Sequence, residues 1–140
     1  MAINTGKVVT GGLLAGFVFN VLDMTWNYTV LADDMKAMVE QLRLNPAVTT
    51  DFSYAIPWIV IDFLFGLVVV WNYAAIRPRF GPGPKTAILA GLVPYFGVVL
   101  VMYGFTAMGV FTMSMWVKNV ALSLITTIAG SVAGAWAYKE

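Results

Sequence analysis

The sequence contains no cysteine and no histidine, and only 11% of its 140 residues are charged. Without these two residue types the chain has no disulfide, no thiolate or imidazole ligand for a metal or cofactor, and no histidine base. Soluble domains carry about 25% charged residues, so the shortage of charge excludes a water-soluble globular enzyme. A net charge of +1 also argues against nucleic-acid binding, which needs a clustered basic surface. The chain is instead rich in hydrophobic residues, which make up 60% of it.

Four long apolar stretches dominate the chain, at about 8–30, 56–76, 86–108 and 115–137. At ~1.5 Å per residue a helix of such length crosses the ~30 Å hydrocarbon core of a bilayer. The alternation of polar and apolar residues that a membrane β-barrel needs is absent from all four stretches. The sequence therefore predicts an all-α, polytopic membrane protein, in which residues 1–140 form one domain with four transmembrane helices in a single bundle.

Basic residues near the ends of these stretches predict the orientation in the membrane. Five would lie on one side: Lys7, Arg77, Arg79, Lys85 and Lys139. Three would lie on the other side, together with several carboxylates: Lys36, Arg43 and Lys118. Because the cytoplasmic side of membrane proteins carries the excess of Lys and Arg, both termini are predicted to be cytoplasmic.

The first outer loop contains a helical pattern at about 34–45. Its apolar residues recur at the spacing of one helix face, at Met35, Met38, Val39 and Leu42. The pattern predicts a short amphipathic helix that lies on the outer membrane surface or caps the bundle. A docking surface for a partner protein is the alternative.

The connection between the second and third stretches, 77–85, is basic and rich in proline and glycine. We expect a stiff, non-helical cytoplasmic turn, because proline fixes φ and glycine allows a tight reversal. In the simplest interpretation, its basic residues only keep this connection on the cytoplasmic side of the membrane. In the second interpretation, Arg77, Arg79 and Lys85 contact the headgroups of anionic lipids.

Small residues mark two candidate packing faces. The first helix has Gly12 and Gly16, and the fourth has Gly130 and Gly134, each pair in the Gly-x-x-x-Gly spacing that lets membrane helices approach closely. We expect the first helix to pack on the fourth near the cytoplasmic side.

Ionisable residues within the apolar stretches predict an intramembrane polar cluster. Asp23 and Asp62 are expected at similar depth in the outer leaflet, and Lys118 enters from the outer end of the fourth helix. Four further polar residues belong to nearby depths: Asn20, Asn27, Asn119 and Tyr103. The cluster fixes the register of the helices, binds a proton, an ion or a small polar ligand, or docks to a partner subunit. It contains no catalytic group paired with a base and no metal-ligand set, so we expect no enzyme and no metal site.

Two segments resemble a family of small four-helix bacterial membrane proteins to which no activity is assigned. These are the opening KVVTGGLLAG at 7–16 and the run WNYAAIRPRFGPGPKTA at 71–87. The resemblance implies a bacterial membrane location and supplies no catalytic residues. We expect a multi-pass protein of the bacterial inner membrane.

Taken together, these observations predict a non-catalytic accessory subunit of a larger bacterial membrane complex, with photosynthetic and respiratory complexes as candidates. Such a subunit would contact membrane lipid and other subunits, and lipid or pigment could fill gaps between them. The alternative is a small homo-oligomeric transporter or channel that uses Asp23 and Asp62 as its proton or ion site.

Overall fold

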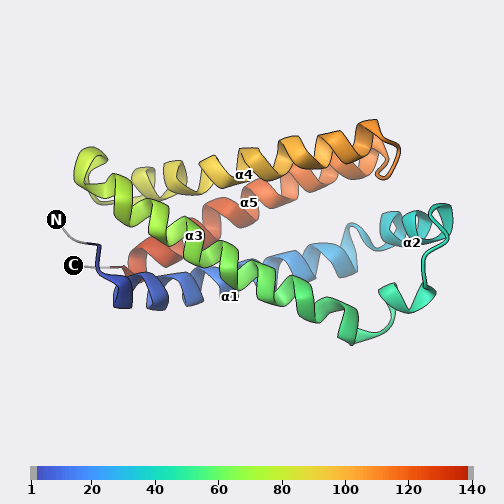
Figure 1. Ribbon diagram of the computed structural model, residues 1–140, viewed down its shortest axis with the longest axis horizontal. Coiled ribbons are helices and arrows are strands. Elements are labelled where there is room, and N and C mark those ends of the chain that lie inside the picture. The colour runs from blue at the N-terminus through green and yellow to red at the C-terminus, as the bar shows by residue number, and fades with distance from the viewer. Residues whose placement is uncertain (1–2, 139–140) are drawn as a thin grey trace.

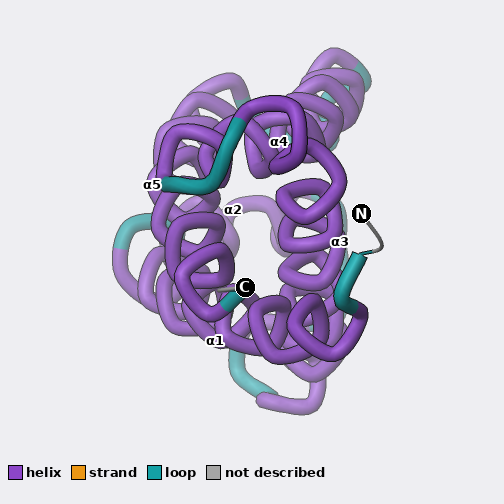
Figure 2. The backbone as a smooth tube through the Cα atoms, turned by 90° about the vertical axis from the view of Figure 1, so that its left-hand side faces the viewer, coloured by secondary structure: helices purple, strands orange, loops and turns teal. Residues whose placement is uncertain are grey.

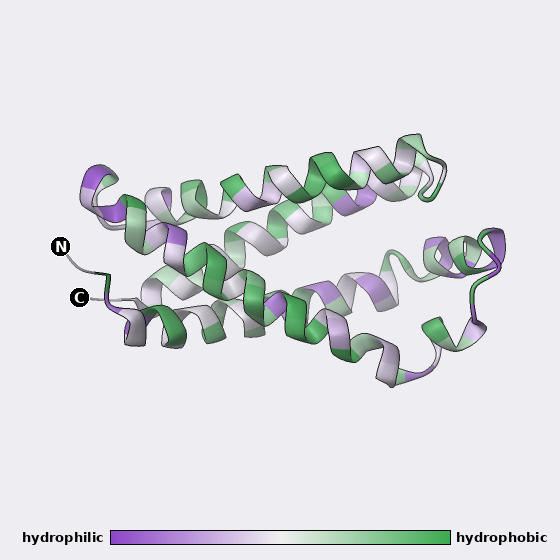
Figure 3. Ribbon diagram, in the orientation of Figure 1, coloured by the Kyte–Doolittle hydropathy of each residue, from purple (hydrophilic) through white to green (hydrophobic). Residues whose placement is uncertain are grey.

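The computed structural model describes residues 3–138, and within that range the chain forms helices and turns without a strand. Four helices are long and apolar enough to cross a membrane: α1 (Thr5–Thr29), α3 (Ile56–Phe80), α4 (Pro84–Ala107) and α5 (Met113–Ala137). The all-α class and four candidate spans are thus confirmed (Figure 1). Hydrophobic residues extend along all four helices, whereas polar residues gather at the α3–α4 turn and around α2 (Figure 3). Lys139, one of the residues used to predict the orientation, lies outside the described residues.

The starts of the long helices follow from local chemistry. The side chains of Asn4 and Thr112 each accept a hydrogen bond from a backbone N–H three residues further on, which caps α1 and α5. Helices α3 and α4 instead have Pro57 and Pro84 in their first turn, where the missing N–H would have had no partner within the helix.

The four long helices surround the bundle axis in the order α1, α3, α4, α5 (Figure 2). Helix α1 packs against α3 and α5, while α4 packs against the same two helices from the opposite side. The two ends of the described chain lie together, and the backbone N–H of Asn4 donates to the hydroxyl of Tyr138 across 3.3 Å. The four spans therefore place both ends of the described chain on the same side of the bundle.

The basic connection at 77–85 differs from the sequence prediction, because most of it is helical. Helix α3 continues through Pro78 to Phe80, and α4 already begins at Pro84. Pro78 keeps a helical φ but removes one backbone hydrogen bond, and α3 ends two residues later at Phe80. Gly81, with φ of 82°, ends α3 and starts the turn.

The loop after α1 contains α2 (Ala32–Gln41) and two 3₁₀ turns, η1 (Pro46–Thr49) and η2 (Phe52–Ala55). Helix α2 is shorter at its C-terminal end than the predicted 34–45. Arg43 adopts a left-handed conformation with φ of 50°, and the N–H of Leu44 returns to the carbonyl of Val39 across 2.9 Å. This turn ends the helix before Asn45 and Pro46 are reached.

Burial is distributed unevenly along the bundle axis. We call the part nearest the chain ends the closed half, since it contains the hydrophobic core of α1, α3, α4 and α5. We call the other part the open half: residues 21–29, 56–65, 96–107 and 113–125. Of these, only Met115 is buried. The α4–α5 pair also separates from the α1–α3 pair toward this end (Figure 1).

Candidate functional site

Asp23 of α1 lies at the start of the open half and is hydrogen-bonded to α5. The hydroxyl of Thr126 donates to Oδ1 of Asp23 across 2.9 Å, and the indole N–H of Trp26 donates to the same hydroxyl across 3.1 Å. Thr126 is buried and both its donor and its acceptor functions are used. Thr126 and Trp26 could not be predicted as partners of Asp23, because nothing in their spacing shows which residue of another helix they meet.

Asp62 of α3 is half-buried and faces the same region. Its carboxylate interacts electrostatically with that of Asp23, so the structure brings the two predicted carboxylates near each other. Among the described residues, however, Asp62 makes neither a hydrogen bond nor an ion pair. A carboxylate in a membrane helix costs about 2.5–3.5 kcal/mol at the centre on insertion scales, so it normally has a partner or faces water.

Asn20 sits beside these carboxylates at the α1–α3 contact. Its amide group donates to the carbonyl of Gly16 across 2.9 Å and to the carbonyl of Ile59 across 3.2 Å, which joins the two helices. The side chain is only 8% exposed, and its Oδ1 has no hydrogen-bond partner among the described residues. The site therefore holds two carboxylates and one amide oxygen with spare capacity to accept hydrogen bonds.

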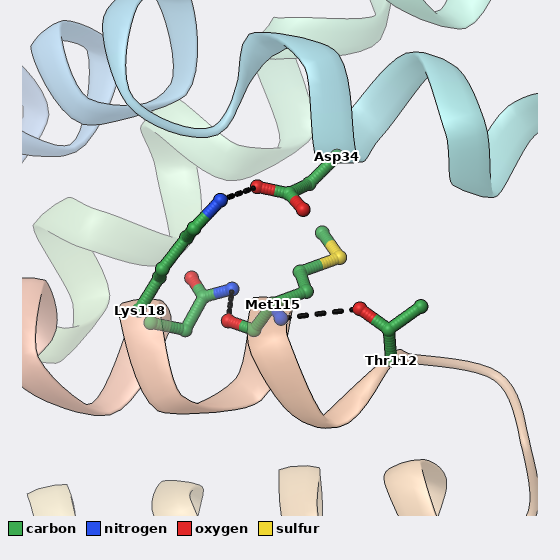
Figure 4. Close-up of polar contacts among 5 residues, drawn as sticks. Asp34, Thr112, Met115 and Lys118 are labelled. Carbon is green, nitrogen blue, oxygen red and sulfur yellow. Dashed lines mark hydrogen bonds and ion pairs between the residues drawn. The ribbon is translucent and has the colours of Figure 1, made fainter.

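Lys118 pairs with a different carboxylate from those predicted. Its ammonium lies 2.6 Å from Oδ2 of Asp34, at the start of α2 (Figure 4). Helix α2 folds back toward the start of α5, and Gln41 also donates to the carbonyl of Gly109, in the connection before α5, across 3.1 Å. The long stem of Lys118 thus reaches outward to the loop helix. The sequence marks Asp34 as a helix-start residue, and only the path of the loop shows that it meets α5.

The remaining polar residues of the predicted cluster make contacts of their own. Asn27 and Asn119 each donate to a backbone carbonyl one turn earlier in their own helices, at Asp23 and Met115. Tyr103 packs edge-on against Trp116, with ring centroids 5.2 Å apart, and is 47% exposed. Asp23, Asp62 and Asn20 are therefore the central part of the site.

The glycines of α1 contact other helices than the sequence predicts. Gly12 and Gly16 face α3, where an added Cβ would lie 2.8 Å from Cα of Leu67 and 2.6 Å from Cα of Phe63, respectively. The close contact of α1 with α5 is present, but Gly11 makes it: its Cβ would lie 2.6 Å from the carbonyl oxygen of Gly134.

Gly130 and Gly134 both lie at the α1–α5 contact. Phe19 fills the space beside Gly130, and Ala15 packs over Gly134. Helix α1 thus has two faces of small residues, one toward each neighbour.

The basic residues near the α3–α4 turn separate into two environments. Arg77 is half-buried and its guanidinium lies 5.8 Å from the ring centre of Tyr138. Arg79 and Lys85 are exposed.

The chemistry available in the open half is the binding of a proton or cation, or the joining of helices. In the described part of the chain no group of three or more acidic residues is placed to hold a metal ion. When the chain was compared with protein-family models, with curated proteins and with solved structures, no match was found.

Proposed function

We propose that the protein is a non-catalytic subunit of a larger membrane complex, and that another membrane subunit covers its open half. In this proposal it is a multi-pass protein of the bacterial inner membrane. Both chain ends face the cytoplasm, as the excess of basic residues at that end favours. The complex is an energy-transducing one, photosynthetic or respiratory, in which lipid or pigment fills the remaining gaps.

The observation that carries the proposal is the uneven core. All four helices bury side chains against one another in the closed half, where glycines allow close approach. In the open half the same helices share no common core, since Met115 is the one buried residue among those described there. A bundle that was complete by itself would be expected to pack along its whole length, since membrane helices associate through such packing.

Polar groups in the open half support the same conclusion. Asp62 has no partner among the described residues, although it belongs to a membrane-spanning helix. Exposure of this carboxylate to lipid would be costly, so a group from another subunit or enclosed water is expected to satisfy it. Catalysis is not part of the proposal, because the sequence has no cysteine, no histidine and no evident nucleophile–base pair.

Purification from native membranes in a mild detergent tests this proposal. We expect the protein to elute with one or more other membrane subunits in fixed stoichiometry, and the absorbance spectrum of the same fraction reports bound pigment. Elution as a monomer or as a homo-oligomer alone, after chemical crosslinking in the membrane, would contradict it.

A second function is favoured by one specific observation, the presence of the carboxylates Asp23 and Asp62 on the packed helices α1 and α3 of a candidate membrane bundle. Two such carboxylates suit a proton or cation path in a homo-oligomeric transporter or channel. Flux of protons or monovalent cations into liposomes that contain only this protein would support that function. Loss of the flux in Asp62→Asn, with folding intact, would assign it to this site.

A further inference from the structure

Three polar side chains lie where the closed half meets the open half, and each keeps an acceptor oxygen that no donor in the described part of the chain fills. Oδ1 of Asn20 makes no hydrogen bond. The carboxylate of Asp62 makes neither a hydrogen bond nor an ion pair. Asp23 accepts from Thr126 with Oδ1, which leaves its Oδ2 unused. The site therefore has acceptor capacity that a group from outside the chain is expected to fill.

Both carboxylates belong to helix faces that point into the bundle. Along α3, Gly66 and Val69 follow Asp62 by four and seven residues, so the three share one face, and both of the later residues are buried. Asp62 continues this buried face into the open half. Asp23 of α1 accepts from the buried hydroxyl of Thr126 in α5, which places its carboxylate on the interior side as well.

The two carboxylates also converge in depth. A Cβ built on Gly16 would lie 3.2 Å from the carbonyl oxygen of Asp62, and the amide of Asn20, one turn later in α1, donates to the carbonyl of Ile59 across 3.2 Å. Side chains tilt toward the N-terminus of their own helix. Because α1 and α3 run in opposite directions, Asp62 tilts toward the open half and Asp23 toward the closed half. Both carboxylates therefore extend toward the level of Asn20.

The side-chain amide of Asn20 directs its free oxygen toward these carboxylates. The amide nitrogen donates to the carbonyls of Gly16 and Ile59, so Oδ1, on the other side of the amide carbon, faces away from both carbonyls. The next turn on this face of α1 carries Asp23. Asn20 is only 8% exposed, and a buried acceptor without a partner is costly. This oxygen is the observation, independent of the two acids, that points to a ligand.

The chemistry of the site identifies the class of ligand. Among the residues of the open half Lys118 alone is basic, and its ammonium is held by Asp34 at 2.6 Å, so the positive charge has to come from elsewhere. Carboxylate and amide oxygens are the ligands of hard cations. A proton bridges two oxygens, whereas three side chains converge here. Ca²⁺ takes about six to eight oxygen ligands, more than these side chains offer.

We propose that one monovalent metal cation of the Na⁺ class binds between α1 and α3. Its ligands are the carboxylate of Asp62, Oδ1 of Asn20 and Oδ2 of Asp23. The ion offsets one of the two negative charges and joins α1 to α3 where their common core ends. The inference deepens the second function proposed above and rests on it for the location of the site. Binding, flux into liposomes and co-purification with other subunits are separate measurements, so failure of one function is distinguishable from failure of the site.

Equilibrium binding of radioactive Na⁺ to the purified protein in detergent tests this proposal. Choline chloride keeps the ionic strength constant, because choline is too large to enter between packed helices. Asp62→Asn removes one charge from the site and keeps the shape of the side chain. Asp33→Asn is the matched control, since it removes an equal charge from an exposed side chain of the loop. Unlabelled Li⁺, K⁺ and Ca²⁺ are added as competitors.

We expect the wild type and Asp33→Asn to bind one Na⁺ per chain saturably. Asp62→Asn is expected to bind it at least about tenfold more weakly, the effect of losing a charged partner. If Asp62→Asn does not fold, the contrast between Asp33→Asn and Asp23→Asn, which keeps an oxygen for Thr126, decides the question. The proposal is overturned if the wild type binds no Na⁺ saturably, if loss of the interior carboxylate leaves binding unchanged, or if Ca²⁺ displaces Na⁺ more readily than Li⁺ and K⁺ do.

Discussion

The hydroxyl of Thr126 in α5 donates to Oδ1 of Asp23 in α1 across 2.9 Å, where the closed half meets the open half. The same hydroxyl accepts from the indole of Trp26, so one buried side chain joins two residues of the neighbouring helix. Beyond this point no residue of α1 is buried. The contact is therefore the last firm connection between α1 and α5 before the two helices lose their common core.

Replacing Thr126 tests the value of this connection. Thr126→Val keeps the shape of the side chain but removes both hydrogen bonds. We expect a loss in the free energy of unfolding of about 0.6–1.7 kcal/mol, from the average to the largest contribution of a hydrogen bond between membrane helices. Chemical unfolding in detergent gives the measurement. Thr126→Ser, which keeps the hydroxyl, should lose clearly less, and equal losses in the two variants would show that the methyl group matters instead.

The contact of α1 with α3 depends on a glycine that backbone atoms surround. A Cβ on Gly66 would lie 2.6 Å from the backbone nitrogen of Gly16 and would also strike the carbonyl oxygen of Gly12. Neither atom can move without shifting α1. Gly66→Ala should therefore lower the free energy of unfolding by about 1–3 kcal/mol, as overpacking does elsewhere.

Gly97 of α4 supplies the matched control, because nothing lies within 4 Å of a Cβ built there. Gly97→Ala should change stability by less than about 0.5 kcal/mol. If both variants unfolded at the same denaturant concentration, the close α1–α3 packing would be refuted.

The ion pair between Lys118 and Asp34 holds α2 to the start of α5. Lys118→Gln should release α2 at a cost of about 0.5–1 kcal/mol, since the pair is partly exposed. We expect trypsin to cleave faster after Lys36 and Arg43 in this variant than in the wild type. Mass spectrometry of the fragments measures the two rates. Lys36→Gln is the control: its 3.7 Å pair with Asp33 is exposed, so the rate of cleavage after Arg43 should not change.

One pH dependence follows from the loop outside the spans. The backbone N–H of Ser53 donates to the carboxylate of Asp51 across 2.9 Å and lowers the pKa of that group from its usual value. Because the folded pKa is the lower one, the contribution to local order is complete above the ordinary aspartate pKa and is lost as the pH falls through the folded value. The carboxyl chemical shifts of Asp51 should titrate at a lower pH than the ordinary aspartate pKa. Titration at the ordinary value would contradict the contact.

The four spans could be predicted because a long apolar run indicates a membrane helix whatever packs beside it. Which helix contacts each face could not be predicted. Gly11 and Gly12 are adjacent in sequence but point about 100° apart around α1, so one meets α5 and the other meets α3. The Gly-x-x-x-Gly pattern indicates close packing and carries no information about which helix approaches.

Two further sequence predictions, for the 77–85 connection and for the partner of Lys118, were wrong because tertiary contacts decide them. Proline and glycine content indicated a non-helical connection at 77–85, yet Pro78 is tolerated in the last turn of α3. The sequence predicts Lys118 beside the carboxylates of the bundle interior, but Lys118 pairs with Asp34 because α2 returns to the start of α5. The long side chain of a lysine can extend toward the membrane interior or toward the surface, so the position of Lys118 along its helix does not determine its partner.

Photo-crosslinking at two positions of α4 in native membranes tests most directly whether another protein covers the open half. Leu89 in the closed half and Leu100 in the open half share one face of α4, about three turns apart, and both are exposed in the bundle, by 40% and 69%. With a photoreactive amino acid at either position, the account predicts a protein adduct of one defined mass at Leu100 and none at Leu89. Absence of a protein adduct at Leu100, or the same adducts at both positions, would contradict it.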